Sequence, residues 1–559
     1  MSAAAAAAAV VKTPVLVVGG GLVGLSAALF LAYHHVPVVV VDKHPGSSLH
    51  PRAIGYTQRT MEMFRAVGLG PDKIPQAPPS FRLKRAQVDS LAGKWHEATE
   101  FTPQQPKPQQ PQQPQQQDPY LYSPCTGAAI AQDKVEPLLR QRAIELGADV
   151  RLSVELLSLT QLADGVTAQV KSRVDGSEYT IQADYVVAAD GHNSQVRDKV
   201  LGVPMSGRGF IRTLRSALFS APALAEYLTR GISQFVIMEP SMKGSFLTTY
   251  MDGRWVLMLP GEQEYSDADL RSYITKAIGR DDVPFEIITQ GRWDLSAHIA
   301  DTFSVGRIFL AGDAAHTLPP TRGGYGANTG IEDAHNLAWK LAAVLKGHAS
   351  PKLLDTYDAE RRPISWLRFH QMFARGDYKQ YASKDDKAPP PDTPILDDMA
   401  IEVGQLYWSS AVFDPANPTA TKDDMPLAKK PDEWRGQPGT RAPHIWLKTG
   451  GDPAIAERPT SLDLFQKDGW IVLSEDAAWK DAVAKHNVKA PVKFVHVGRD
   501  MTFDSEDPAV FTKAFSLAPS AGGAVLVRPD GYIAWRSVDL PADPAAVLNE
   551  ALSKVLHLN

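Results

Sequence analysis

The feature that most constrains this fold is a strand, a glycine-rich turn, a helix and a second strand within residues 14–42. The first strand is a β-branched apolar run, the turn at residues 19–24 fits G-x-G-x-x-G, and residues 25–33 are rich in Ala and Leu. The second strand ends at Asp42, about twenty residues after the glycines, where an acid accepts a ribose hydroxyl. Glycines let a helix N-terminus approach a pyrophosphate, whose charge meets unpaired N–H groups and the helix dipole.

This unit predicts an α/β fold with a Rossmann-like, dinucleotide-binding domain. The alternative is a glycine-rich turn in some other α/β protein, because G-x-G-x-x-G alone is a weak signal. The residues predicted to contact the cofactor in this unit are Gly19, Gly21, Leu22, Val23, Gly24, Asp42 and Lys43.

Length and composition narrow the class of protein. A chain of 559 residues predicts about two to four domains. The net charge of -5, without a basic cluster, argues against nucleic acid as a partner. The single cysteine, Cys125, excludes an intramolecular disulfide or a cysteine metal cluster, and we predict no metal site. No apolar run reaches membrane-spanning length, and residues 3–9 resemble a loose tail more than a signal peptide, so we expect a cytoplasmic protein.

Apolar periodicity and turn residues predict further elements. Helices are expected at residues 57–66, 133–146, 267–278, 331–345 and 353–373, the last with a break near Pro363. Separate strands are expected at residues 179–181 and 185–189, and residues 210–259 are rich in strand-like runs. From about residue 440 strand and helix patterns alternate again, which indicates a separate small α/β domain.

Two more apolar strands end in an acid beside a glycine. One leads into Asp190-Gly191, and the other leads into Gly312-Asp313. Ligands of open α/β sheets bind at the carboxyl ends of the strands, so each pair is a candidate binding turn. Each acid alone could equally be an ordinary helix cap. The three motifs in this order are more specific than any one of them.

With these motifs the chain resembles the FAD-dependent aromatic hydroxylases, which are single-component class A flavoprotein monooxygenases. Within that family it most resembles the phenol-hydroxylase and polyketide-hydroxylase branch. The resemblance covers about residues 14–363 and extends to the C-terminal domain. It implies that the first motif holds the ADP half of noncovalently bound FAD. It also implies that Asp190 and Gly191 touch FAD and the nicotinamide donor, and that Asp313 bonds the ribityl chain.

The resemblance implies further contacts to the flavin. Arg52 and Gln132 match positions that contact it, and residues 319–328 match the loop that lines the isoalloxazine. In that loop, the backbone N–H groups near the pyrimidine edge are expected from Gly326, Ala327 and Asn328. The residues expected to act on the substrate are Pro320, Arg322 and Tyr325.

The implied reaction uses NADPH or NADH as a transient donor and O₂ as the oxidant. A flavin C4a-hydroperoxide then hydroxylates a phenolic or polycyclic aromatic substrate, which lies between the flavin and the sheet of residues 210–259. Baeyer–Villiger or epoxidising oxygen transfer on the same scaffold remains open, because the flavin motifs do not distinguish these outcomes. A non-oxygenating FAD dehydrogenase, or a flavin-binding protein without catalysis, is the remaining alternative.

One departure from the family concerns the group that activates the phenol. The phenol-hydroxylase branch carries an acidic residue as base near residues 53–56, and this chain has the apolar Ile54 there. One alternative is that the substrate is acidic enough to need no protein base. The other is that Arg322, which cannot act as a base, lowers the pKa of the phenol through its fixed charge. Tyr56 and Tyr325 are the remaining nearby titratable residues.

The resemblance also sets the expected domains. The FAD-binding domain is expected at residues 1–207 and 300–383, and an inserted β-sheet substrate domain at residues 208–299. A linker is expected at residues 384–439, before a thioredoxin-like α/β domain at residues 440–559. No cysteine lies in that last domain, so thiol–disulfide exchange is excluded. Its expected role is structural or oligomeric, for example in a homodimer.

Residues 103–117 are almost entirely Gln and Pro, and such a segment cannot bury apolar surface. We therefore predict a disordered insertion, with a polyproline II ligand for a partner as the alternative. Deleting it and joining its ends with a short linker should leave turnover nearly unchanged, because loop closure adds little free energy. A fall of more than about tenfold in the turnover of folded protein would instead show that the segment covers the site.

Overall fold

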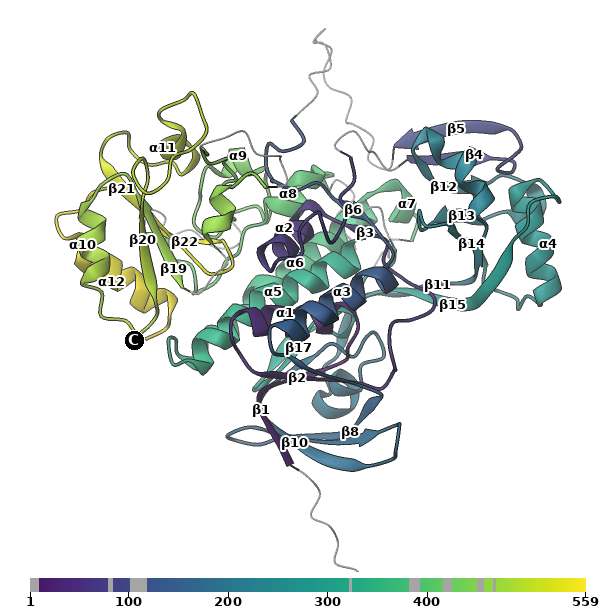
Figure 1. The fold of residues 1–559 in the computed structure, drawn as a ribbon, viewed down its shortest axis with the longest axis horizontal. Helices are drawn as coiled ribbons and strands as arrows, with labels where there is room; N and C mark the ends of the chain where they lie inside the picture. The colour runs from purple at the N-terminus through teal and green to yellow at the C-terminus, as the bar shows by residue number, and fades with distance from the viewer. Residues whose placement is uncertain are drawn as a thin grey trace, which may run out of the picture.

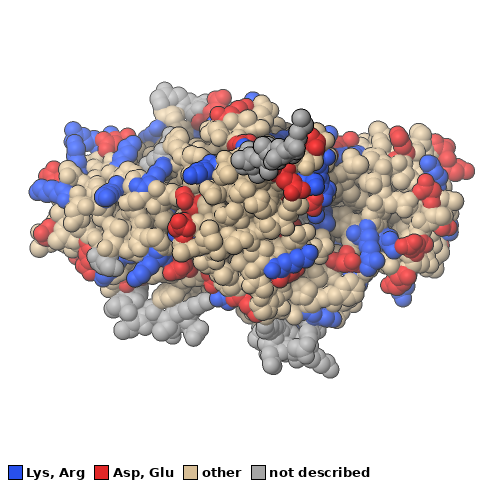
Figure 2. Space-filling model, turned by 90° about the horizontal axis from the view of Figure 1, so that it is seen from below, with Lys and Arg blue, Asp and Glu red and all other residues tan. Residues whose placement is uncertain are grey.

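A computed structural model describes residues 10–78, 84–100, 118–320, 324–381, 393–415, 425–449, 457–465 and 469–558. The predicted insertion at residues 103–117 and the candidate Arg322 lie outside these ranges. Three units lie side by side in Figure 1: a central unit with most of the helices, a second sheet that includes β4 (Lys84–Val88) and β5 (Trp95–Glu100), and the C-terminal unit. In the face seen in Figure 2, acidic and basic side chains are interspersed.

The first sheet belongs to the central unit, and most strands of its main path are parallel. Its main path is β16-β17-β10-β1-β2-β7, with β8 and β9 added through β10. The strands are β1 (Val10–Val18), β2 (Val38–Asp42), β7 (Asp149–Leu152), β8 (Val154–Gln161), β9 (Val166–Ser172), β10 (Glu178–Ala188), β16 (Ser304–Val305) and β17 (Ile308–Leu310). The strands predicted at residues 179–181 and 185–189 are one strand, β10, because the same backbone pairs with β9 on one side and β1 on the other.

Helices pack on this sheet, and the glycine-rich turn connects β1 to the first of them. They include α1 (Leu22–Tyr33), α2 (Gln58–Ala66), α3 (Gln132–Glu145), α5 (Tyr325–Leu345) and α6 (Asp355–Ala374). The helix expected at residues 331–345 begins six residues earlier, so part of the predicted flavin loop is the first turn of α5. The break expected near Pro363 is absent, because α6 continues through this residue with buried side chains on both sides of it.

The second sheet has the order β18-β15-β11-β14-β13-β12-β4-β5. Its strands are β4 (Lys84–Val88), β5 (Trp95–Glu100), β11 (Met205–Ser220), β12 (Ile232–Ile237), β13 (Phe246–Thr249), β14 (Arg254–Pro260), β15 (Glu286–Ala300) and β18 (His316–Thr317). Strands β4 and β5 lie in the stretch that sequence reasoning assigned to the FAD-binding domain. The sequence could not reveal this, because β4 pairs with β12, which lies far along the chain.

The two faces of the second sheet have different environments. Side chains of a strand alternate between faces. Phe219, Leu247 and Leu257 are buried in one core cluster together with Ile274 of α4 (Asp267–Ile278). Phe246, which precedes Leu247, and Met258, which follows Leu257, line a cavity that is described below.

The C-terminal unit has a four-stranded sheet in the order β20-β19-β21-β22. Its elements are β19 (Trp470–Ser474), α10 (Ala478–Ala484), β20 (Val492–His496), α11 (Val510–Ala514), β21 (Gly522–Val527), β22 (Ile533–Asp539) and α12 (Pro544–Val555). Strands β19 and β20 are parallel, whereas β21 runs antiparallel to β19 and β22. The alternation of strands and helices predicted after residue 440 is confirmed.

The expected linker at residues 384–439 is packed into the molecule where the structure describes it. It contains α8 (Asp398–Val403) and α9 (Pro431–Trp434), and the side chains of Glu402, Gln405 and Tyr407 are buried. The residues before α8 and residues 414–433 have the charged, Pro-rich composition of a linker. The remaining short elements are β3 (Gly55–Tyr56), β6 (Ala128–Ala129) and α7 (Gly376–Lys379). None of the helices within the described ranges is both long and apolar enough to cross a membrane.

Candidate active site

A cavity of about 3090 Å³ lies where the carboxyl ends of β1, β2 and β10 face the second sheet. Ligand pockets of about 300–1,000 Å³ hold one drug-sized molecule, so this space can hold a dinucleotide and a second ligand together. The cavity is lined by the glycine-rich turn, by both acid–glycine turns and by the loop before α5. The three motifs that are far apart in the sequence therefore meet at one site.

The glycine-rich turn is shaped so that the backbone can approach a ligand. A Cβ on Gly24 would lie 1.8 Å from the Gly19 carbonyl oxygen, and Gly19 itself has a φ of +101°. The N-cap residue of α1 is a glycine, and the first N–H bonded within the helix is that of Leu25. The Leu22 N–H donates to the Glu136 carboxylate. The N–H groups of Val23 and Gly24 are therefore the first-turn donors that can meet an anion, as a pyrophosphate site requires.

Asp42 ends β2 at the rim of this turn. Its two carboxylate oxygens accept the Gly20 N–H at 2.6 Å and the His44 N–H at 2.7 Å. A carboxylate offers about four lone-pair sites, so it can still accept a ribose hydroxyl. Lys43 follows it as an exposed residue of the cavity rim.

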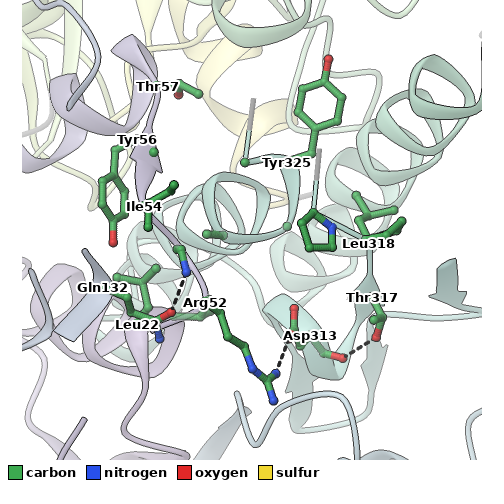
Figure 3. A pocket seen from close by; sticks show the side chains of 18 of the residues that line it. Leu22, Arg52, Ile54, Tyr56, Thr57, Gln132, Asp313, Thr317, Leu318 and Tyr325 are labelled. Carbon is green, nitrogen blue, oxygen red and sulfur yellow. Dashed lines mark hydrogen bonds and ion pairs between the residues drawn. The ribbon is translucent and has the colours of Figure 1, made fainter. Parts of the chain in front are cut away.

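Arg52 and Asp313 both line the cavity, and their charged groups lie next to each other (Figure 3). The Arg52 Nη1 lies 3.7 Å from the Asp313 Oδ2 and 3.5 Å from the His192 Nδ1. The side chains of Arg52 and Asp313 are 57% and 38% exposed. Both charged groups thus remain accessible to a bound molecule. Burial lowers the pKa of His192, and the nearby Arg52 lowers it further, so this imidazole is neutral at physiological pH.

Gln132 connects α3 to the chain after Arg52. Its Oε1 accepts the Ala53 N–H at 3.1 Å, and its Nε2 donates to the Glu136 carboxylate at 2.7 Å. These two bonds determine the orientation of the amide. The neighbouring Ile54 packs with an apolar cluster that includes Tyr250 and Met258. No carboxylate is therefore present at the position where the branch has its base.

The loop before α5 supplies a second helix N-terminus. Gly324 is the N-cap and has no side-chain cap, and Tyr325, Gly326 and Ala327 line the cavity. The prediction for Asn328 is wrong in one respect, because its N–H donates to the Gly324 carbonyl within the helix. Its side chain is fully buried, and its Oδ1 accepts from Thr57 N at 3.1 Å and from Thr60 Oγ1 at 2.6 Å. Asn328 therefore anchors this turn to α2.

Two of the expected catalytic residues are described, and they differ in environment. Pro320 is exposed at the cavity, and its carbonyl accepts the Tyr378 hydroxyl at 2.7 Å. The Tyr325 side chain is buried, and in Figure 3 it points away from the Arg52–Asp313 pair. Burial raises the pKa of its phenol. Tyr325 is therefore unsuited to act as a base.

Asp190 mainly organises its own turn. Its carboxylate accepts the Ser194 hydroxyl at 2.5 Å and the Val196 N–H at 3.1 Å. Burial raises its pKa. This is the capping role that was the alternative in the sequence analysis. The backbone from Asp190 to His192 still lines the cavity, and Gly191 has a φ of +84°.

Sequence reasoning placed the substrate against the sheet of residues 210–259 but did not name the residues of the wall that this sheet presents to the cavity. Leu214, Phe246, Met258 and Trp293 line it. Behind them the Trp293 Nε1 donates to Ser216 at 2.8 Å, and the Ser216 Oγ lies 2.8 Å from the His50 Nε2. Alternation within each strand could have grouped the wall residues, but no local signal shows which face meets the cavity.

Glu402 of α8 is a second missed residue. It lines the cavity beneath the first turn of α5 and is 6% exposed. Its nearest cation is Arg368, with an Nη2 that lies 3.5 Å from the Glu402 Oε2. Burial raises the pKa of Glu402 to about 7, although the charge of Arg368 acts in the opposite direction.

The fold and this cavity define a dinucleotide-binding oxidoreductase of the α/β class. The family described as "FAD binding domain" matches residues 12–371, and the one described as "Aromatic-ring hydroxylase, C-terminal" matches residues 435–557. The chain belongs to the family of FAD-dependent aromatic-ring hydroxylases, and it is a flavoprotein monooxygenase.

Similar proteins extend over almost the whole chain. A 4-methyl-5-nitrocatechol 5-monooxygenase from a Burkholderia species is 36% identical over 96% of both chains. A tetracenomycin B2 monooxygenase-dioxygenase from Streptomyces olivaceus is 35% identical over 96% of this chain and 97% of its own. The solved structure of an aklavinone-11 hydroxylase with FAD and aklavinone superposes with a TM-score of 0.81, at 32% identity, over 98% of this chain and 99% of that one.

The accessible Asp313 carboxylate provides a first test of the cofactor site. Asp313→Asn should weaken FAD binding about 10- to 100-fold, because hydrogen bonds to a charged acceptor contribute about 1.5–3 kcal/mol. Titration of the FAD-free protein with FAD, followed by flavin fluorescence, measures this. Asp301→Asn is the matched control, since Asp301 is an exposed carboxylate that accepts from Ser206. Equal FAD affinities in both variants would show that Asp313 does not contact the cofactor.

The raised pKa of Glu402 makes folding stability depend on pH. The folded state binds this proton more tightly than the unfolded state, so its contribution is fully present below the ordinary pKa of 4.5 and is lost as the pH rises through about 7. Glu402→Gln should therefore stabilise the protein at pH 8, by up to about 3 kcal/mol, and much less at pH 5. Calorimetry at both pH values tests this. Glu178→Gln, which removes an exposed partner of Lys171, should show no such difference.

Proposed function

We propose that this monooxygenase uses NADPH or NADH and O₂ to hydroxylate a phenolic, polycyclic aromatic compound of the polyketide type. The observation that carries the proposal is the meeting of two uncapped helix N-termini and an apolar, aromatic wall at one cavity. The helix termini suit the pyrophosphate and the electron-rich edge of a flavin. The wall suits a flat aromatic substrate next to it.

In this proposal the two motif-bearing turns hold the two ends of FAD. The first turn of α1 donates to the pyrophosphate, and Asp42 accepts from the ribose. Asp313 accepts from the ribityl chain, and the N–H groups of Gly326 and Ala327 donate to the pyrimidine edge. When bound, FAD takes electrons from NAD(P)H and activates O₂ for transfer to the ring. Arg52 is accessible beside Asp313 and would neutralise nearby negative charge.

The residues of the wall orient the substrate and exclude water. Trp293 and Phe246 contribute aromatic surface, and Leu214 and Met258 contribute aliphatic surface. The hydrogen bond from Trp293 to Ser216 prevents the indole from turning. A rigid wall that excludes water would prevent side reactions at the site of oxygen transfer. It would also present one carbon of the substrate ring to the cofactor.

The phenol is proposed to ionise through its own acidity. The apolar surroundings of Ile54 and the buried phenol of Tyr325 support this, because neither position offers a base. Arg322 remains the alternative group that would stabilise a phenolate. Pro320 is proposed to lie next to the reacting ring and to line it with its backbone.

The cavity has room for a polycyclic substrate. A space of about 3090 Å³ can hold such a molecule beside FAD. The aklavinone hydroxylase supports the polycyclic class, since it was solved as a ternary complex with FAD and aklavinone. The second candidate is a substituted single-ring catechol, by analogy with the nitrocatechol monooxygenase.

The domain arrangement is also proposed. Residues 1–207 and 300–383 would bind FAD, and residues 208–299, extended by β4 and β5, would bind the substrate. The C-terminal unit is proposed to be thioredoxin-like, which its βαβ and ββα order supports. A homodimer and a cytoplasmic location complete the proposal.

Purified protein is expected to consume NADPH only when a suitable aromatic compound is present. Under ¹⁸O₂, one labelled oxygen atom should appear as a new hydroxyl on an intact ring. Anthracyclinone-type polyketides and substituted catechols should be compared in the same assay. Gly24→Ala is the matched control, since its Cβ would clash with the Gly19 carbonyl and exclude FAD. A ring-expanded lactone or an epoxide would favour the other oxygen transfers, and unlabelled product would show a dehydrogenase.

A further inference from the structure

A turn of the C-terminal unit enters a buried layer of charges between α5 and α6. The Arg528 side chain is fully buried and donates to both oxygens of Glu360 on α6, at 2.6 and 2.9 Å. It also pairs with Asp530 in its own turn. The same Glu360 accepts from Lys340 on α5 at 2.8 Å. Through Glu360, one arginine of the C-terminal unit therefore joins α6 to α5, whose first turn belongs to the predicted flavin loop.

The next residues of this turn make a second, separate contact. The Tyr532 ring stacks on Tyr407 with a centroid distance of 4.0 Å and an interplanar angle of 10°. Tyr407 precedes the C-terminal unit and is buried. Its hydroxyl accepts from the Arg361 Nη1 of α6 at 2.8 Å. The position of Tyr407 thus depends on Tyr532, and one Arg361 hydrogen bond depends on Tyr407.

Arg361 in turn orients the acid that holds the Gly312-Asp313 turn. Its Nε donates to the Asp333 Oδ1 at 2.8 Å. The Asp333 Oδ2 accepts the Gly312 N–H at 3.2 Å and lies 2.7 Å from the His316 Nε2. All three side chains are 0% exposed. Asp313 is the next residue of that turn.

We propose that the C-terminal domain is a positioning element of the flavin site: Tyr532 acts through Tyr407, Arg361 and Asp333 to hold the Gly312-Asp313 turn. The inference rests on the proposed contact between Asp313 and FAD. Its physical basis is that Arg361 and Asp333 are buried charges with several hydrogen-bond partners each, which leaves them few alternative arrangements. Tyr407 is one of the partners of Arg361, and Tyr532 holds it by stacking. A role beyond stability and oligomer formation is thereby assigned to this domain.

The test compares two substitutions in the C-terminal unit. Tyr532→Leu removes the stacked ring, and it should weaken FAD binding at least about fivefold and shift the flavin midpoint potential. Tyr532→Phe keeps the ring and should restore both values. Trp479→Phe is the matched control: Trp479 is buried in the same unit and donates to the Gly522 carbonyl at 2.8 Å, but it does not contact this chain of residues. It should lower the melting temperature without changing FAD affinity or potential.

A double-mutant cycle with Asp313→Asn tests whether Tyr532 and Asp313 are energetically coupled in FAD binding. If Tyr532 acts through the Gly312-Asp313 turn, the effects of Tyr532→Leu and Asp313→Asn on FAD affinity should be non-additive. Additive effects, or an equal loss of FAD affinity in Trp479→Phe, would overturn the inference. The readouts need no substrate, so a protein that binds FAD but does not hydroxylate would contradict the proposed function and leave this inference standing. If Asp313→Asn binds FAD as tightly as the wild-type protein, the proposed contact between Asp313 and FAD, on which both proposals rest, is wrong.

Discussion

The carboxylate of Asp333 is the interaction on which the site depends most. It is fully buried, and it bonds the Gly312 N–H, His316 and Arg361 at the same time. Burial acts to raise the pKa of Asp333, but the charges of His316 and Arg361 outweigh this and lower it. A buried carboxylate without partners would cost several kcal/mol. The Gly312 turn, α5 and α6 are therefore held in the relative positions that keep all partners of Asp333 within hydrogen-bond distance.

The charged layer around Asp333 explains why the helices and the C-terminal domain form one unit. Arg528 and Lys340 share Glu360, and Arg368 pairs with Glu332, all without exposure to water. Burial lowers the pKa of Lys340 to about 8, which shows how strongly the low dielectric acts even beside a carboxylate. Buried ion pairs add little net stability compared with apolar packing. We infer that their effect here is to specify one relative position of the helices.

The second sheet serves two purposes because its strands alternate. One face buries Phe219, Leu247 and Leu257 against α4, and the other presents Phe246 and Met258 to the cavity. The side of the cavity next to β1, β2 and β10 is made of backbone donors and acids, whereas the second sheet contributes aromatic and apolar side chains. In the proposed function the first side binds FAD, and the second selects the substrate.

The sequence by itself determined the cofactor class, because the glycines, Asp42 and the two acid–glycine turns lie in local patterns with a fixed spacing. It also predicted α2, α3, α4 and the C-terminal strands, whose periodicity is local. Only the tertiary structure showed that α5 begins at Tyr325, that α6 passes Pro363 and that β4 and β5 join the second sheet. These features depend on packing and pairing between distant segments, which override local propensity. The same physical reason applies to Asp333: its role exists only where α5, α6 and the Gly312 turn meet.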